Sequence, residues 1–149
     1  MISLKFSGKF NQCVDYLPKN LAFLEIQSSF NQSVDFLPPK LKQLILGDQF
    51  NQLIDKLPNS ITHLTVGRSF NQSIDILPKD LTHLFLRSEI YSRPLDNLPR
   101  TLLHLAIYTK YDKNIDNLPP ALETIQLHKH QVSLVKKIPC NCKLVIFSN

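Results

Sequence analysis

Three histidines, His63, His83 and His104, occupy the same position in successive copies of a repeated sequence pattern. If the pattern forms stacked strands, their Cβ atoms lie about 5 Å apart. Imidazoles at this spacing could bind zinc, or could repel one another on protonation. Side chains in a ladder point the same way, however, and do not converge on one point as tetrahedral ligands must. We therefore predict a stack of neutral imidazoles and no metal site, with zinc binding and a pH-sensitive interface as the alternatives.

Aspartate recurs once in every full copy of the pattern. The set comprises Asp15, Asp35, Asp55, Asp75, Asp96 and Asp116. Six carboxylates in a file would repel unless each is matched, and aspartate at a turn commonly accepts backbone amide hydrogen bonds. A calcium-binding β-roll also repeats aspartate, but it needs glycine-rich turns, and this chain has 3 glycines. We predict a structural ladder in which residues such as Asp35, Asp55 and Asp75 cap the turns.

Motifs that serve catalysis in other proteins are missing from the sequence. It contains no P-loop, no G-x-S-x-G, no H-E-x-x-H and no C-x-x-C motif. A thiol nucleophile with an imidazole base can be imagined only for Cys140 with His128 or His130. Cys140 follows a proline in the last, partial copy, where Cys142 takes a leucine position. We predict no enzymatic activity, no catalytic residue and no cofactor.

These residues are positioned by a sequence that restates itself about every 20 residues. Four copies open with F-N-Q and continue as [V/I]-D-x-L-P-x-x-[L/I]-x-x-L-x-[L/I/V]; they start at Phe10, Phe30, Phe50 and Phe70. A fifth copy follows with one residue inserted near Ile90, and a sixth starts at Tyr111. A repeat of this length indicates a stacked array in which each unit buries its apolar residues against its neighbours.

Each copy carries a strand signal after a helix-breaking pair. Leu44 and Leu46 fall on one side of an extended segment and Ile45 on the other. The Leu-Pro pair before the strand removes an amide donor and favours extended geometry. Twenty residues are also too few for a strand, a helix and two turns. We predict a mainly β, right-handed, leucine-rich-repeat-like solenoid with short parallel strands on a concave face and little helix.

The whole chain is assigned to this one domain, residues 1–149. An N-terminal half-repeat caps it at 1–9, six repeats occupy 10–130, and a C-terminal cap occupies 131–149. We expect the recurring phenylalanines to stack inside the coil. An amide both donates and accepts hydrogen bonds, so the asparagines that follow them are predicted to form a buried ladder that satisfies neighbouring turns. These are Asn11, Asn31, Asn51 and Asn71.

The motif L-x-x-L-x-L is that of leucine-rich repeats. With F-N at the head and L-P-x-x-L in the middle, the chain resembles the FNIP repeats that abound in social amoebae and in giant viruses that infect amoebae. The resemblance covers roughly residues 10–127, although Gln12 and its equivalents replace the isoleucine of the motif. It implies a protein-interaction module, in some members placed after an F-box that recruits ubiquitin-ligase machinery. No segment here has room for an F-box, so that role would need another chain.

Strand residues that do not point inward are the candidates for binding. Aromatic, histidine and arginine side chains gather on this face around the fourth to sixth repeats, and such residues anchor protein interfaces. We name them the aromatic–basic patch, which comprises His63, His83, Phe85, Arg87, His104 and Tyr108. The main prediction is that the patch binds an unidentified protein partner. The alternatives are a structural or self-associating repeat protein and a substrate-recognition component of ubiquitin-ligase machinery.

The net charge of +5 comes mostly from the last third of the chain, where Lys136 and Lys137 are adjacent. This density is thin for a nucleic-acid footprint, so nucleic acid is an unlikely partner. The 3 cysteines are odd in number, and no signal peptide or membrane span is visible. We expect no membrane contact and a cytoplasmic, intracellular protein, in the host cytoplasm if it is viral.

The last predicted strand, residues 144–147, is apolar and has only Lys143 as an adjacent charge. We assign Leu144 and Ile146 of this strand to the concave face. An apolar edge strand invites pairing with another chain. We therefore predict weak two-fold self-association through the C-terminal strand.

Overall fold

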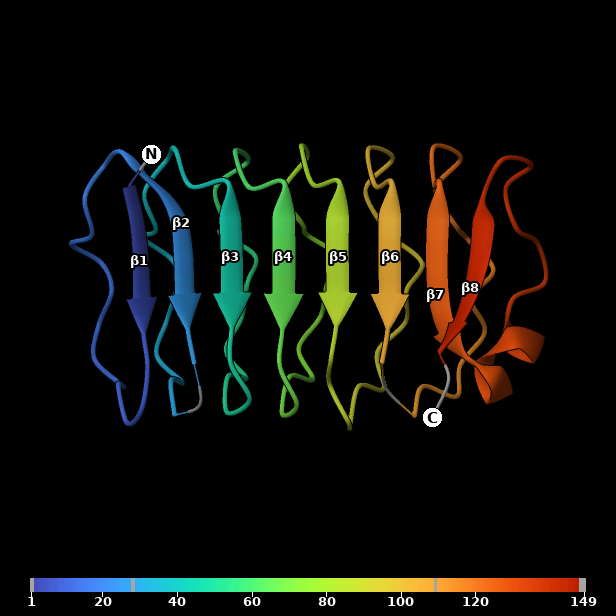
Figure 1. Ribbon diagram of the computed structural model, residues 1–149, viewed down its shortest axis with the longest axis horizontal. Helices are drawn as coiled ribbons and strands as arrows, with labels where there is room; N and C mark the ends of the chain where they lie inside the picture. The colour runs from blue at the N-terminus through green and yellow to red at the C-terminus, as the bar shows by residue number, and fades with distance from the viewer. Residues whose placement is uncertain (1, 28, 109, 148–149) are drawn as a thin grey trace.

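The computed structural model describes residues 2–27, 29–108 and 110–147. It contains one parallel sheet whose eight strands lie side by side in chain order (Figure 1). A return leg behind the sheet connects each strand to the next, and one short 3₁₀ helix follows the seventh strand (Figure 1). The elements are β1 (Ile2–Phe6), β2 (Leu21–Ile26), β3 (Gln43–Leu46), β4 (His63–Val66), β5 (His83–Leu86), β6 (His104–Ile107), β7 (Thr124–His128), η1 (Lys129–Leu134) and β8 (Lys143–Phe147). The predicted mainly β repeat solenoid with little helix is confirmed.

Alternation along each strand separates a buried column from an outward one. In β4, Leu64 and Val66 are fully buried, whereas His63 and Thr65, which alternate with them, are half-exposed. The parallel register places Leu64 between Leu44 and Leu84, so like residues stack on like. This stacking explains why the sequence repeats, because each unit covers the apolar face of the one before it.

The L-P-x-x-L spacing closes a turn that leads into each strand. In the turn before β3, the N–H of Leu41 donates to the carbonyl of Pro38 at 3.1 Å, and the N–H of Leu81 donates to that of Pro78 at the same distance. The proline needs no amide partner of its own, and its carbonyl accepts the bond that closes the turn. The leucine after the turn enters the core with no exposed surface.

The phenylalanine column is longer than the F-N motif indicates. Phe30, Phe50 and Phe70 stack with ring centroids 6.0 and 6.2 Å apart. Tyr91 continues the stack 6.2 Å from Phe70, and Tyr111 follows 6.1 Å further on. Both tyrosine hydroxyls are buried without a hydrogen-bond partner, and burial raises the pKa of Tyr111 to about 12. The tyrosines therefore replace phenylalanine as packing residues at a cost in unsatisfied hydroxyls.

The asparagine column is a ladder, but it is not buried. The side-chain Oδ1 of each asparagine accepts the backbone N–H of the next at 2.9 Å, from Asn11 through Asn31 and Asn51 to Asn71. Ser92 ends the run by donating its N–H to Asn71 at 3.1 Å. Asn11 and Asn31 are exposed and the other two are half-exposed, so the prediction of a buried ladder is wrong. A glutamine also contacts the ladder from the next repeat, since the side chain of Gln72 donates to Oδ1 of Asn51 at 3.1 Å.

The aspartates do not cap their own turns as predicted. Among the described residues none of their carboxylates accepts a backbone amide, and the N–H groups of Asp35 and Asp75 donate instead to serines two residues earlier. Four of the carboxylates, those of Asp35, Asp75, Asp96 and Asp116, accept from side chains of the following repeat. Asp35 binds Lys56 at 2.9 Å, and Asp75 accepts from Asn97 at 2.9 Å. This side-chain pairing between repeats relieves the repulsion within the column.

Two irregularities affect which residues face outward. Ile90, where the sequence shows an inserted residue, is an exposed bulge before Tyr91, so the interior columns continue undisturbed. At the C-terminus the step from one strand to the next is one residue shorter than in most repeats, so Lys143 pairs with Thr124 and Leu144 with Ile125. Leu144 and Ile146 therefore continue interior columns, and their assignment to the outward face is wrong. Val145 and Phe147 face outward in their place.

Candidate functional site

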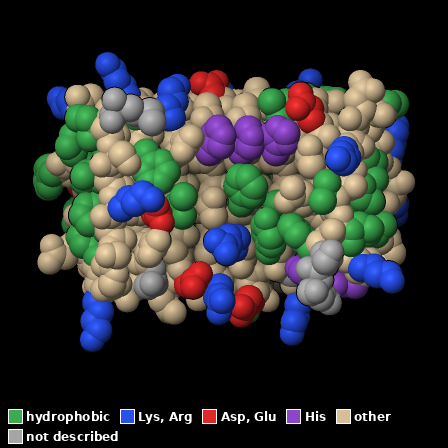
Figure 2. Space-filling model, viewed as in Figure 1, with side chains coloured by type: hydrophobic (Ala, Val, Ile, Leu, Met, Phe, Trp, Pro, Cys, Tyr) green, Lys and Arg blue, Asp and Glu red, His purple; other side chains and the backbone are tan. Residues whose placement is uncertain are grey.

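The outward face of the sheet carries the aromatic–basic patch. The register places His63, His83 and His104 opposite one another in β4, β5 and β6. The rings of His63 and His83 stack with centroids 4.0 Å apart, and the ring of His104 lies 4.3 Å from that of His83 at a tilt of 34°. Figure 2 shows the three imidazoles as one continuous row across this face. The expected juxtaposition is thus present in the structure.

Threonines hold the first two imidazoles in place. The hydroxyl of Thr62 lies 3.1 Å from the carbonyl of Lys42 and 2.9 Å from Nδ1 of His63. Thr82 contacts His83 and the carbonyl of Thr62 in the same way. These contacts fix the ring positions, and each neutral ring has one nitrogen that donates and one that accepts hydrogen bonds.

His63 and His83 resist protonation. Burial and the neighbouring histidines lower the pKa of His83 from 6.5 to about 4, and burial lowers that of His63. The pKa of His83 is lowered more than that of His63, because His83 lies between two other imidazoles that would become cations. In the described part of the chain no group of three His, Cys, Asp or Glu residues has the geometry to hold a metal ion.

Phe85 lies below the imidazole row in the middle column of the face. It is half-exposed, and its ring centroid is 6.4 Å from that of His83. Its neighbour in β6 is Ala106, which is buried. A hollow opens beside Ala106, and its walls include Phe85, His104 and Gln126. The short alanine side chain between two longer neighbours produces this notch.

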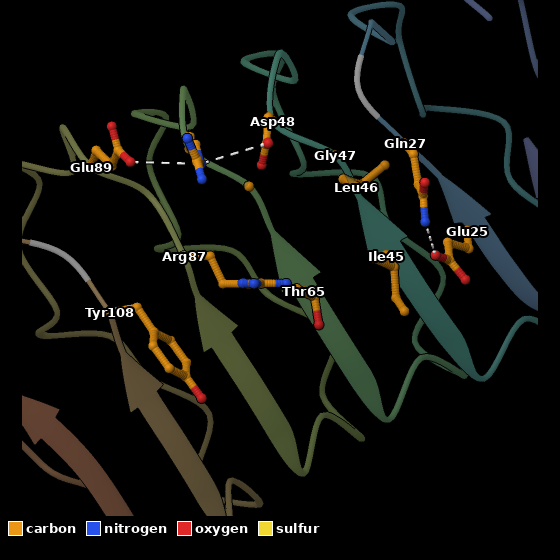
Figure 3. Close-up of a pocket in the computed structure, with 12 residues that line it drawn as sticks. Glu25, Gln27, Ile45, Leu46, Gly47, Asp48, Thr65, Arg87, Glu89 and Tyr108 are labelled. Carbon is orange, nitrogen blue, oxygen red and sulfur yellow. Dashed lines mark hydrogen bonds and ion pairs between the residues drawn. The ribbon is translucent and has the colours of Figure 1, made fainter. Parts of the chain in front are cut away.

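A larger hollow of about 390 Å³ lies at the ends of β2 to β6 (Figure 3). Its floor includes Gly47 and Gly67, and its walls include Thr65, Arg87 and Tyr108. Strand alternation in the sequence placed Arg87 and Tyr108 on this face but did not predict the hollow. The two successive glycines in the outward column were the signal that could have indicated it.

Tyr108 belongs to a further aromatic contact that the sequence did not reveal. Its ring centroid lies 4.1 Å from that of Phe147 in β8, and Phe147 also lies 5.3 Å from His128. The shortened last turn brings Phe147 to this position. The patch therefore extends from β4 to the last strand of the sheet.

The described residues bring together no thiol and imidazole. Cys13 and Cys140 are exposed, Cys142 is half-exposed, and all three are free thiols. Burial raises the pKa of the Cys142 thiol, which disfavours the reactive thiolate. No helix in this part of the chain has the length and apolar character needed to cross a membrane.

Comparison with a solved structure agrees with this architecture. The chain is similar to CroV588, described as a novel circular leucine-rich-repeat (LRR) protein, with a TM-score of 0.77 and 30% sequence identity. The similarity covers 97% of this chain and 23% of CroV588, so the chain spans less than a quarter of that protein's length. Among curated proteins none matches.

The family model for the FNIP Repeat matches residues 13–49, 30–57 and 50–88. Together these segments span residues 13–88, which are 76 of the 149 residues. The match includes the F-N, L-P and leucine positions whose side chains form the stacked columns. The chain belongs to the FNIP-repeat family.

Proposed function

We propose that this protein is a non-catalytic interaction module that binds a protein partner through the aromatic–basic patch. The observation that carries the proposal is the contrast between the two faces of each strand. Inward positions hold the same residue type in repeat after repeat, but outward positions change from Gln43 to His63 and from Thr65 to Phe85. Stacking alone does not account for aromatic and cationic side chains on a half-exposed, rigid face.

The chemistry of the patch suits a protein surface. Aromatic residues and arginine are enriched among the residues that contribute most to binding at protein interfaces. The aromatic rings bury large areas with little loss of conformational freedom, and arginine offers several hydrogen-bond donors. The imidazole row adds polar rings, two of which are held in place by threonine contacts. Similarity to CroV588 supports the fold but names no partner.

A capture experiment with matched variants tests the proposal. The tagged protein is incubated with an extract of the cells that express it, and bound proteins are identified by mass spectrometry. Phe85→Ser should lose a specific bound protein. Phe36→Ser is the control, because Phe36 is 68% exposed on a return leg away from the sheet face. Equal capture by both variants would contradict the proposal, and capture of ubiquitin-ligase components would favour the substrate-recognition alternative.

Self-association through β8 is the second candidate function. In the described residues β8 pairs with β7 on one side and has no strand on the other, and Ile146 is 49% exposed. Strands with open edges pair with other chains unless charges block them. We propose weak two-fold pairing of this edge with that of a second copy. Light scattering should detect dimers that Ile146→Lys abolishes, and a wild-type chain that stays monomeric at millimolar concentration would contradict the pairing.

A further inference from the structure

We propose that the hollow above Gly47 and Gly67 is a carboxylate-binding subsite that accepts an aspartate or glutamate side chain from an extended segment of the partner. This inference rests on the proposed function and specifies what the partner presents. It concerns the ends of β2 to β6, on the same face of the sheet as the imidazole row, and Arg87 is its principal contact.

The hollow exists because two successive repeats lack a side chain in one outward column. Gly67 is required there, since a Cβ at this position would lie 2.4 Å from the carbonyl oxygen of Gly47. Real Cβ atoms do not approach backbone so closely, and the backbone cannot give way as a flexible side chain would. The floor is therefore bare main chain, flanked by the longer side chains of Gln27 and Arg87.

Most charges around the hollow are already matched. Glu25 forms an ion pair with Lys5 at 2.8 Å and also accepts a hydrogen bond from Gln27. At the rim, Arg68 lies between Asp48 and Glu89, 3.6 Å from each carboxylate (Figure 3). Within the described ranges, the guanidinium of Arg87 forms no ion pair and no hydrogen bond, so it is available to a ligand.

Neutral donors complete the subsite. Figure 3 shows Arg87 extending from the end of β5 toward Thr65, with Tyr108 on its other side. Thr65, Phe85, Arg87 and Tyr108 together line one continuous part of the surface. A guanidinium binds a carboxylate through two parallel hydrogen bonds, and the two nearby hydroxyls can donate to the same oxygens.

The surrounding acids favour a carboxylate over a phosphate. Glu25, Asp48 and Glu89 all lie around the hollow and would repel a dianion more strongly than a monoanion. One guanidinium matches one negative charge. The hollow is open along the sheet, and the apolar side chains of Ile45 and Phe85 lie near it. An extended peptide can place an acidic side chain on Arg87 and apolar neighbours on these two residues.

Selection from a random peptide library tests this assignment even while the partner is unidentified. Twelve-residue peptides displayed on phage are selected on the immobilised full chain, and the enriched peptides are synthesised for affinity measurement. We expect enriched peptides to share an aspartate or glutamate at one position. Arg87→Gln should weaken their binding about tenfold, and Thr65→Val should weaken it less. Arg100→Gln is the matched control, because Arg100 is an exposed arginine outside the hollow.

A charge-reversed variant sharpens the test. Selection on Arg87→Glu should enrich lysine or arginine at the position where the wild type enriches an acid. Peptides that depend on Phe85 but tolerate Arg87→Gln would overturn the carboxylate subsite and leave the proposed function standing. Failure to enrich any peptide would overturn both the carboxylate subsite and the proposed function. Peptide binding that neither Phe85→Ser nor Arg87→Gln weakens would also overturn both.

Discussion

The inward and outward columns of the same strands follow opposite rules. Inside, Leu44, Leu64 and Leu84 repeat one residue type and have no exposed surface. Outside, the middle column changes from Ile45 to Thr65 to Phe85, and these positions stay half-exposed. Stacking at the strand spacing requires like residues to fit against like only where water is excluded. The fold is thus specified by one half of each strand, and the other half is free to acquire binding residues.

The largest effect should come from breaking an inward column. Leu64→Ala removes buried methyl groups from the centre of the stack, and neighbouring repeats hold the cavity open. The free energy of unfolding should fall by about 2 to 5 kcal/mol. Urea denaturation followed by circular dichroism measures this loss. Thr65→Ala, on the opposite face of the same strand, is the control, and an equally large loss there would remove the distinction between the two faces.

Interrupting the asparagine ladder should lower the free energy of unfolding by a smaller amount. Asn51→Ala removes the acceptor of the Asn71 amide and of the Gln72 side chain. Because Asn51 is half-exposed, water replaces part of these bonds, and we expect a loss of about 1 to 2 kcal/mol. The same denaturation assay compares it with Asn20→Ala at an exposed turn. Equal stability of the two variants would show that the ladder adds nothing.

Acid should destabilise the protein through the imidazole row. The pKa of His83 is about 4 in the folded chain against 6.5 for a free histidine, so the unfolded chain binds more protons between these values. Stability should therefore fall as the pH is lowered from about 6.5 toward 4. Carboxylates also titrate near the lower limit, so the informative quantity is the difference from His83→Gln. The urea midpoint of this variant should depend less on pH, and an unchanged dependence would contradict the stacked, desolvated row.

The smallest change in stability is expected on the outward face. Phe85→Ser should alter the free energy of unfolding by less than about 1 kcal/mol, because Phe85 is not part of the interior. The losses of stability in Phe85→Ser and Leu64→Ala can be compared with each other, since Phe85 and Leu64 lie in the adjacent central strands β5 and β4. A loss as large as that of Leu64→Ala would mean that Phe85 is structural, and would remove the main support for the aromatic–basic patch.

Periodicity in the sequence predicted the columns because one residue of each unit must stack on its equivalent. The insertion at Ile90 was visible for the same reason, since the motif resumes after it. The final turn escaped prediction because it lacks the full motif, and its shortening by one residue exchanged the faces of Leu144 and Val145. Tyr91 and Tyr111 were not recognised as core residues, because a hydroxyl is rarely buried without a partner.

The site was less predictable than the fold. Strand alternation placed His83, Phe85 and Arg87 on one face, but it gave no indication of the threonine contacts that hold two of the imidazoles. The hollow depends on missing side chains at two glycines and on the direction of a long arginine. The glycines are visible in the sequence at equivalent positions, but the direction of the arginine side chain does not follow from the type or spacing of residues.

Each strand pairs only with its neighbours in chain order, and this has an evolutionary consequence. An in-frame duplication of one unit lengthens the sheet by one strand without disturbing any distant contact. The new copy inherits its inward residues unchanged, which keeps it foldable from the moment it arises. Its outward residues can then diverge under selection, so that the recognition surface grows one row at a time.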